Sequence, residues 1–80
     1  MSDIRDDVKA LLGQTCAVAA AAIRDDARLI EYGLDSVRAM DLVIALEERF
    51  SISIPDADAA RLKTVADLVA YVEKRAGGAA

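Results

Sequence analysis

The sequence predicts an all-α fold, a small four-helix bundle of three long helices and one short one, with a long loop between helices one and two. Apolar residues recur at helical spacing in three separate segments. The run Ser51–Ile54 alternates as a strand does, but it has no second strand to pair with, and we expect an extended connection there. Eighty residues suffice for one modest core, so residues 1–80 are expected to form a single domain.

The first long helix is expected over about residues 3–17. Ile4, Val8, Leu11 and Leu12 repeat there at i, i+4, i+7 and i+8. The segment 18–35 loses this periodicity and reaches Gly33 near its end, which is typical of a loop. The one cysteine, Cys16, falls within the first helix and is expected to be a small core residue.

The remaining helices are bounded by recognisable start signals. Asp35 and Ser36 are both good N-cap residues for a second long helix that runs to about Phe50. A short helical turn is expected from Pro55 to about Arg61. Thr64 and Asp67 have the spacing of a capping box, which predicts the start of the last helix, with its apolar stripe at Val65, Leu68, Val69 and Val72. The tail 77–80 should fray, so the ordered part is expected to span about residues 3–75.

The composition argues against several classes of function. The net charge is −4, whereas a nucleic-acid surface needs clustered Lys and Arg. With no histidine and one cysteine, a zinc site is not expected, and neither is any other metal site. The apolar run 17–23 is too short to span a bilayer and no basic segment precedes it, so we expect a cytoplasmic protein that binds no membrane. We also expect a monomer.

The negative charge is concentrated in the middle of the chain. Between residues 31 and 58, seven acids stand against two arginines. Such a patch would steer the protein toward a basic partner surface, with a strong dependence on salt. An ordinary solvated acidic helix face is the alternative.

The second long helix is apolar on two opposite sides. A core face is formed by Ala39, Leu42, Val43, Leu46 and Phe50. The opposite side also carries apolar residues, surrounded by acids: Val37, Met40 and Ile44 with Asp41, Glu47 and Glu48. A helix of this kind is either buried on both sides or keeps one side for a partner. The acidic rim favours a docking surface.

Ser36 stands at the start of this helix, at a position that suggests chemistry. A nucleophilic serine needs a nearby base, and the chain has no histidine. The Gly-x-Ser-x-Gly turn of serine hydrolases is absent as well. We therefore expect no catalytic residue in this chain.

Four segments together resemble the acyl carrier proteins. They are Gly33-Leu-Asp-Ser36, Leu42-Val-Ile-Ala-Leu-Glu-Glu-Arg-Phe50, Ile54-Pro-Asp-Ala-Asp58 and Val65-Ala-Asp-Leu68. The resemblance extends from Ile4 to Arg75. It implies that Ser36, next to the motif residue Asp35, receives 4′-phosphopantetheine from coenzyme A through a phosphodiester. A separate phosphopantetheinyl transferase supplies the base and the metal ion, so the carrier needs neither. The helix N-terminus suits the added phosphate.

The resemblance also implies the partners and the surface that binds them. Acyl groups would be carried as thioesters, loaded by an acyl-, aryl- or aminoacyl-activating ligase or by an acyltransferase. They would then be used by downstream synthase, condensing or transfer enzymes. The residues expected to face these partners are Val37, Arg38, Met40, Asp41, Ile44, Glu47 and Glu48.

Two residues depart from the pattern of fatty acid synthesis, in which leucine and an acid usually follow the modified serine. In this sequence the two residues after Ser36 are Val37 and Arg38. The block Leu29–Met40 resembles instead the aryl carrier domains of siderophore assembly. The cargo therefore stays open between a fatty or polyketide chain and the aryl, aminoacyl or peptidyl group of a siderophore or nonribosomal peptide pathway. An unmodified helical adaptor is a remote alternative. Arg38 would either pair with Asp35 or Asp41, or meet an acid on a dedicated partner.

Overall fold

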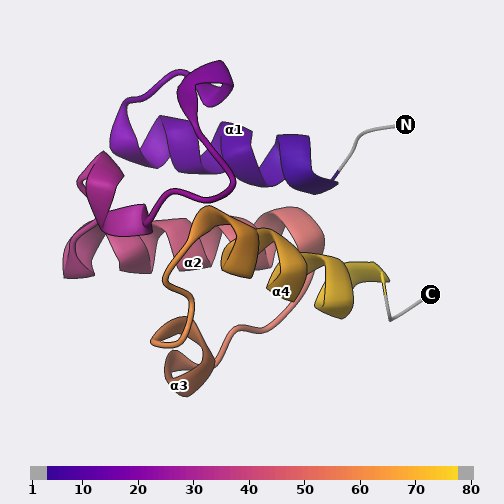
Figure 1. Cartoon of the computed structure of the whole chain (residues 1–80). Helices are drawn as coiled ribbons and strands as arrows, with labels where there is room; N and C mark the ends of the chain where they lie inside the picture. The colour runs from indigo at the N-terminus through magenta and orange to yellow at the C-terminus, as the bar shows by residue number, and fades with distance from the viewer. Residues whose placement is uncertain (1–3, 78–80) are drawn as a thin grey trace.

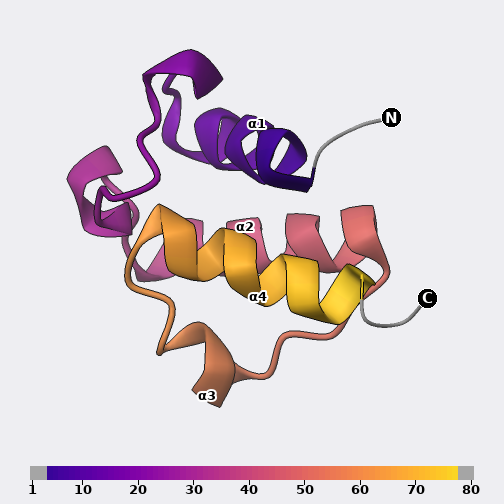
Figure 2. The same cartoon turned by 45° about the vertical axis from the view of Figure 1, so that its right-hand side comes forward.

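The computed structural model describes residues 4–77, which form a bundle of four α-helices. The long helices are α1 (Ile4–Cys16), α2 (Ser36–Phe50) and α4 (Val65–Gly77), and α3 (Asp56–Ala59) is short. α1 packs against both α2 and α4 and runs in the opposite direction to them (Figure 1). Turned by 45°, the same cartoon shows α3 beside the beginnings of α2 and α4 and away from α1 (Figure 2). The expected all-α bundle is confirmed.

α1 ends because the chain turns into the left-handed region. Ala17 has a φ of 58°, and the Val18 N–H donates to the Gly13 carbonyl oxygen at 2.9 Å, which closes the last turn. Gly13 is needed for this closure, since a Cβ there would be 2.5 Å from the Val18 oxygen. The helix expected over about 3–17 is thus confirmed over Ile4–Cys16, while residue 3 lies outside the described part.

The connection between α1 and α2 is the expected long loop, and it includes short helical turns. It contains two 3₁₀ helices, η1 (Ala20–Ala22) and η2 (Leu29–Tyr32). Short 3₁₀ turns leave no apolar repeat, so they could not be predicted from the residue pattern. Asp25 joins this connection to α1 and α4. Its carboxylate pairs with Arg5 and Lys9 of α1, and its backbone carbonyl accepts from the Ala66 N–H of α4.

η2 is joined to the start of α4 by backbone pairing. Arg28 and Thr64 form an isolated antiparallel β-bridge, and the Leu29 N–H donates to the Lys63 carbonyl at 2.9 Å. Within residues 4–77 this bridge is the only β-type pairing, and Ser51–Ile54 is an extended connection as expected. The pairing fixes η2 beside the segment that follows α3.

The predicted caps of α2 and α4 are present. Asp35 is the N-cap of α2, and its Oδ1 accepts from the Arg38 N–H at 2.8 Å. At α4, the Asp67 N–H donates to Thr64 Oγ1 and the Thr64 N–H donates to Asp67 Oδ2. α3 is shorter than the helix expected to reach Arg61, although turn-type hydrogen bonds continue to Leu62. Of the tail 77–80, where fraying was expected, Gly77 is still part of α4, and residues 78–80 lie outside the described part.

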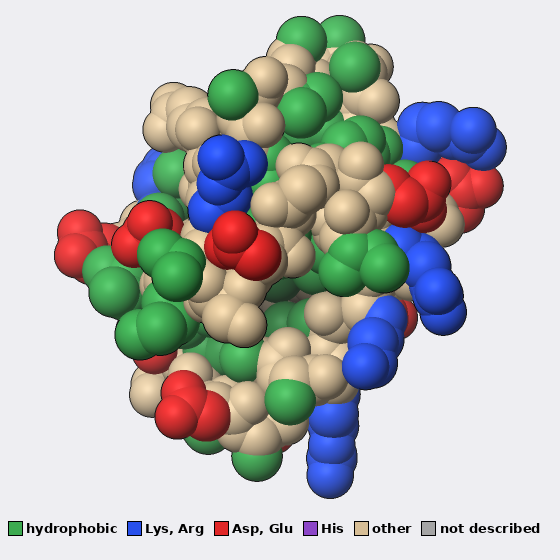
Figure 3. All heavy atoms as spheres, turned by 90° about the vertical axis from the view of Figure 1, so that its left-hand side faces the viewer, with side chains coloured by type: hydrophobic (Ala, Val, Ile, Leu, Met, Phe, Trp, Pro, Cys, Tyr) green, Lys and Arg blue, Asp and Glu red, His purple; other side chains and the backbone are tan. Residues whose placement is uncertain are grey.

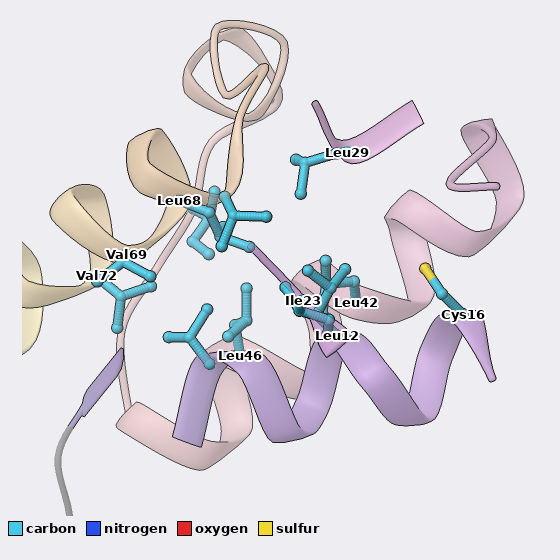
Figure 4. Close-up of a cluster of buried hydrophobic side chains, with 12 residues drawn as sticks. Leu12, Cys16, Ile23, Leu29, Leu42, Leu46, Leu68, Val69 and Val72 are labelled. Carbon is cyan, nitrogen blue, oxygen red and sulfur yellow. The ribbon is translucent and has the colours of Figure 1, made fainter. Parts of the chain in front are cut away.

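The core lies where the three long helices meet and is aliphatic (Figure 4). Leu12 and Leu46 are fully buried at its centre, and Cys16 closes one end, where burial raises the pKa of its thiol. η2 contributes Leu29 and the connection contributes Ile23. The other buried members are Val8, Leu42, Ile54, Val65, Leu68, Val69 and Val72. A wall of aliphatic side chains therefore lies beneath one face of α2 and leaves the other face outward.

Candidate functional site

Ser36 is the first residue of α2 and is exposed. It follows Gly33, whose φ of 81° ends η2 and turns the chain toward α2. With Asp35 as the cap, the Arg38 N–H is bonded, whereas the N–H groups of Ser36 and Val37 have no acceptor within residues 4–77. The start of α2 therefore presents a hydroxyl beside two unbonded N–H groups and the positive end of a helix dipole.

Two grooves meet at Ser36. The first, here called the basic groove, lies between η2, the start of α2 and the segment after α3, and has a volume of about 530 Å³. Its lining includes Arg28, Ile30, Leu34, Ser36, Leu62 and Lys63. The second, the apolar groove, is about 650 Å³ and lies between α2 and α3; its lining includes Ser36, Met40, Val43, Ile44, Ile54 and Ala59. Ala39 and Ala60 line both, so small side chains form the floor where the two grooves join.

The two grooves differ in charge. Arg28 and Lys63 line the basic groove, together with Asp35, while Glu47 and Asp56 line the apolar groove. Seen from the end at which α2 begins, most of the Lys and Arg side chains lie to the right of the central hollow (Figure 3). Acidic side chains lie mainly to its left, beside a group of hydrophobic side chains at the left edge.

The outward side of α2 carries the expected apolar strip. Val37 is 69% exposed, Met40 66% and Ile44 51%, so this side is not a second core face. The alternative of a helix buried on both sides is excluded by these exposures. One apolar residue was missed: Ile30 of η2 is 69% exposed and lies on the same end of the molecule as Ser36. It follows the buried Leu29 in a turn too short to show an apolar repeat, so the pattern could not tell which of the two is exposed.

The acids of residues 31–58 do not all belong to a docking face. Glu31 accepts from the Arg28 N–H, and Asp58 binds Tyr71 Oη at 2.8 Å and Arg75 Nη2 at 3.0 Å. Burial, followed by this hydrogen bond to Asp58, raises the pKa of Tyr71. Within the described part of the chain, the side chains of three acids on α2 and α3 form no hydrogen bond or ion pair: Asp41, Glu48 and Asp56.

Glu47 has a different place from the one expected. Its Oε2 accepts a hydrogen bond from the Ile54 N–H at 2.8 Å, and the contact is partly buried. The bond ties α2 to the connection that leads to α3. The sequence pattern put Glu47 on the exposed rim because it follows the helix alone, and the partner of its carboxylate lies seven residues further along the chain. Glu47 therefore has a structural role at the edge of the apolar groove that the helix pattern did not indicate.

Arg38 forms no ion pair with Asp35 or Asp41, nor with any other described carboxylate. A Cβ added to Gly33 would lie 3.6 Å from its Nη1, so the guanidinium lies over the turn before α2. Its positive charge also acts to lower the pKa of the Cys16 thiol, against the larger effect of burial, which raises it. The first of the two explanations offered for Arg38, a pair within the helix, is thus not realised.

The residues around Ser36 suit attachment better than catalysis. The hydroxyl is accessible, and the two unbonded N–H groups beside it favour an anion. Among the described residues, no three His, Cys, Asp or Glu side chains are grouped to hold a metal ion. No described helix is both long and apolar enough to cross a membrane. The small floor at Ala39 and Ala60 leaves room on both sides of the serine for a long attached group such as 4′-phosphopantetheine.

Comparisons with known proteins identify the family. A family model described as "Phosphopantetheine attachment site" matches residues 6–72. The chain is similar to an acyl carrier protein of Helicobacter hepaticus, 44% identical over 72 residues that cover 89% of this chain and 95% of the relative. An acyl carrier protein of Akkermansia muciniphila is 41% identical over 80 residues, covering 96% of this chain and all of the relative.

Solved structures agree with this result. The solution structure of hexanoyl acyl carrier protein from the actinorhodin polyketide synthase of Streptomyces coelicolor has a TM-score of 0.79 and 27% identity, and covers 94% of this chain and 92% of that one. The crystal structure of an acyl carrier protein from Thermotoga maritima has a TM-score of 0.72, covering 92% of this chain and 95% of that one. At 23% identity, this second likeness supports the fold alone. The chain therefore belongs to the acyl carrier protein family, whose members carry acyl groups on 4′-phosphopantetheine and are not themselves catalysts.

Proposed function

We propose that Ser36 Oγ is the attachment point of 4′-phosphopantetheine, and that a phosphopantetheinyl transferase adds this group from coenzyme A. The observation that carries the proposal is the position of Ser36: exposed, first in α2, and shared by both grooves. The other serines within residues 4–77, Ser51 and Ser53, line neither groove. When attached, the group supplies a thiol that holds acyl cargo as a thioester.

The chain's own contribution is to present the serine and to accommodate an anion next to it. Asp35 caps α2 by accepting from the Arg38 N–H, which keeps the first turn formed while Ser36 stays exposed. The unbonded N–H groups of Ser36 and Val37 favour the negative charge of a phosphodiester, with the helix dipole acting in the same direction. The base and metal for the attachment belong to the transferase.

Attachment is tested by incubating the protein with coenzyme A and a broad-specificity transferase, followed by intact mass measurement. We expect a gain of one phosphopantetheine in the wild type and in the Ser53→Ala control, and none in Ser36→Ala. A gain in Ser36→Ala would contradict the assignment. A failure of the wild type to gain mass would contradict the carrier function itself.

We also propose that partner enzymes bind the strip formed by Val37, Met40 and Ile44, with Asp41 and Glu48 at its rim. The partner would combine an apolar patch with basic residues around it. Ile30 extends the strip onto η2. Loading enzymes and downstream synthase or condensing enzymes would share this surface, and the carrier would act as a cytoplasmic monomer.

The strip is tested by Met40→Glu and Glu48→Lys in an acyl-transfer assay. Both residues are exposed, so we expect weaker transfer with nearly unchanged helicity and melting temperature. Glu73→Lys, an exposed charge reversal on α4, is the matched control and should transfer normally. Unfolding in Met40→Glu, or equal transfer in all three variants, would refute the docking role.

For Arg38 we propose contact with an acid on a dedicated partner. The absence of an ion pair among the described carboxylates supports this, because a cation in the first turn of a helix opposes the helix dipole. Arg38→Asp should improve use by a fatty acid synthesis ketosynthase or malonyl transferase and impair charging by the protein's own loading enzyme. Unchanged rates with both enzymes would make Arg38 an ordinary surface residue.

The cargo that we propose is a fatty acyl or polyketide chain. The segments Leu46–Phe50 and Ile54–Asp56 and the similarity to curated acyl carrier proteins support this class. The block Leu29–Met40 favours an aryl group as the second candidate. Mass measurement of the carrier isolated from its producing cells decides between them, since an aryl thioester and an aliphatic one differ in mass.

A further inference from the structure

We propose that Arg28 and Lys63 form an anion site in the basic groove, filled by an oxyanion that modified Ser36 brings to it. The oxyanion is either the phosphodiester of the arm or a carboxylate at the end of a carried acyl group. This inference rests on the proposed attachment at Ser36. It adds a binding site for that anion.

The first support is the way in which the two cations are held together. The β-bridge of Arg28 with Thr64 and the hydrogen bond from the Leu29 N–H to the Lys63 carbonyl fix their backbones side by side. Both residues line the basic groove. The backbone pairing therefore holds both cations at the same groove.

The second support is that both cations lack a carboxylate partner in the described part of the chain. Of the eight other Lys and Arg residues, five pair with a carboxylate: Arg5, Lys9, Arg24, Arg49 and Arg75. Arg28 and Lys63 pair with none of the carboxylates of residues 4–77. Asp35 lines the same groove but forms no ion pair with either cation, and its Oδ1 accepts from the Arg38 N–H.

The third support is the way in which the two grooves divide the chemistry. Glu47 and Asp56 line the apolar groove and would repel an anion there. The basic groove combines its two cations with the apolar side chains of Ile30, Leu34 and Leu62. These apolar side chains would contact the methylene groups of the attached arm or acyl chain, while its charged part lies against Arg28 and Lys63. An anion tethered at Ser36, where the grooves meet, is thus directed to the side of Arg28 and Lys63.

The site is tested by NMR on four samples whose state is first verified by mass: unmodified, phosphopantetheinylated, butyryl-loaded and glutaryl-loaded protein. We follow the Arg28 Nε–Hε and Lys63 Cε signals, with Arg61, an exposed cation outside both grooves, as the internal control. A change on phosphopantetheinylation identifies the phosphodiester as the anion. A change confined to the glutaryl sample identifies the carboxylate. Either result supports the site.

Two results would overturn it. If the modified samples form but Arg28 and Lys63 respond no more than Arg61, the anion site is wrong while the attachment at Ser36 stands. If no sample gains mass, the proposed attachment fails and the site fails with it.

Melting temperatures provide an independent measurement. Lys63→Gln should lower the melting temperature more in the sample that carries the anion than in the unmodified protein, because only the former loses an anion contact. Arg61→Gln, which changes a cation outside both grooves, should have the same effect in both samples. An equal effect of Lys63→Gln in both states would contradict an anion held by Lys63.

Discussion

The hydrogen bond from the Ile54 N–H to Glu47 Oε2 makes Glu47 a structural residue, and this predicts a large effect for Glu47→Ala. The acceptor is charged, the distance is 2.8 Å, and Ile54 is only 4% exposed. Hydrogen bonds to charged groups contribute about 1.5–3 kcal/mol, and an unsatisfied buried N–H is left when the acceptor is removed. Glu47→Ala should therefore lower the free energy of unfolding by about that amount.

Two smaller effects of this substitution have the opposite sign. Alanine is a better helix former than glutamate by a few tenths of a kcal/mol. Removing an acid from the C-terminal half of α2 is also slightly favourable for the helix dipole. Glu48→Ala shares both gains, because Glu48 is the next residue of the same helix, but it has no hydrogen bond to lose. The difference between the two variants therefore isolates the bond.

The assay is thermal unfolding followed by circular dichroism, checked by urea unfolding. For a domain of this size, about 1.5–3 kcal/mol corresponds to a melting temperature lower by roughly 6–20 °C. Glu48→Ala should stay within about 2–4 °C of the wild type. Glu47→Gln keeps a neutral acceptor and should fall between the two. Equal melting temperatures for Glu47→Ala and Glu48→Ala would refute the reasoning and return Glu47 to the exposed rim.

Two further predictions concern the segment that connects α1 and α2. Gly13→Ala should destabilise the protein, because the new Cβ would lie 2.5 Å from the Val18 oxygen. Alanine in place of glycine normally strengthens a helix by about 0.5–1 kcal/mol, so a lower melting temperature would have the opposite sign to the usual effect. Thermal unfolding measures this, with the exposed Gln14→Ala of the same helix as the control. The hydrogen bond from Lys9, aided by the charge of Arg5, lowers the pKa of Asp25 below its ordinary value of 3.8. The ionised carboxylate therefore stabilises the fold above about pH 4, and this stabilisation is lost as the pH falls through the lowered pKa. Asp25→Asn should therefore lower the melting temperature at pH 7, and a difference from the wild type that fails to shrink between about pH 4 and pH 2 would contradict this.

Local signals predicted most of the helical framework because each depends on residues close in sequence. The capping box of Thr64 and Asp67 and the cap at Asp35 are both formed within three residues. The exposures of Val37, Met40 and Ile44 follow from the angle between successive residues of one helix. A surface made by one helix could therefore be predicted before the fold was known.

Features that depend on two distant segments could not be predicted in this way. The carboxylate of Glu47 looked exposed because its partner, Ile54, lies beyond the end of the helix. Arg28 and Lys63 are far apart in sequence and become neighbours through the pairing of η2 with the start of α4. η1 and η2 have too few residues to produce a repeat.

The most direct test of the attachment at Ser36 is peptide mapping of the protein purified from its producing cells. Trypsin cleaves after Arg28 and Arg38, and so isolates Ser36 on the fragment Leu29–Arg38, while Ser51 and Ser53 fall on Phe50–Arg61. We predict that phosphopantetheine, with or without acyl cargo, is found on Leu29–Arg38 and is absent from Phe50–Arg61. Phosphopantetheine on Phe50–Arg61, or a Leu29–Arg38 fragment that is always unmodified, would contradict the assignment.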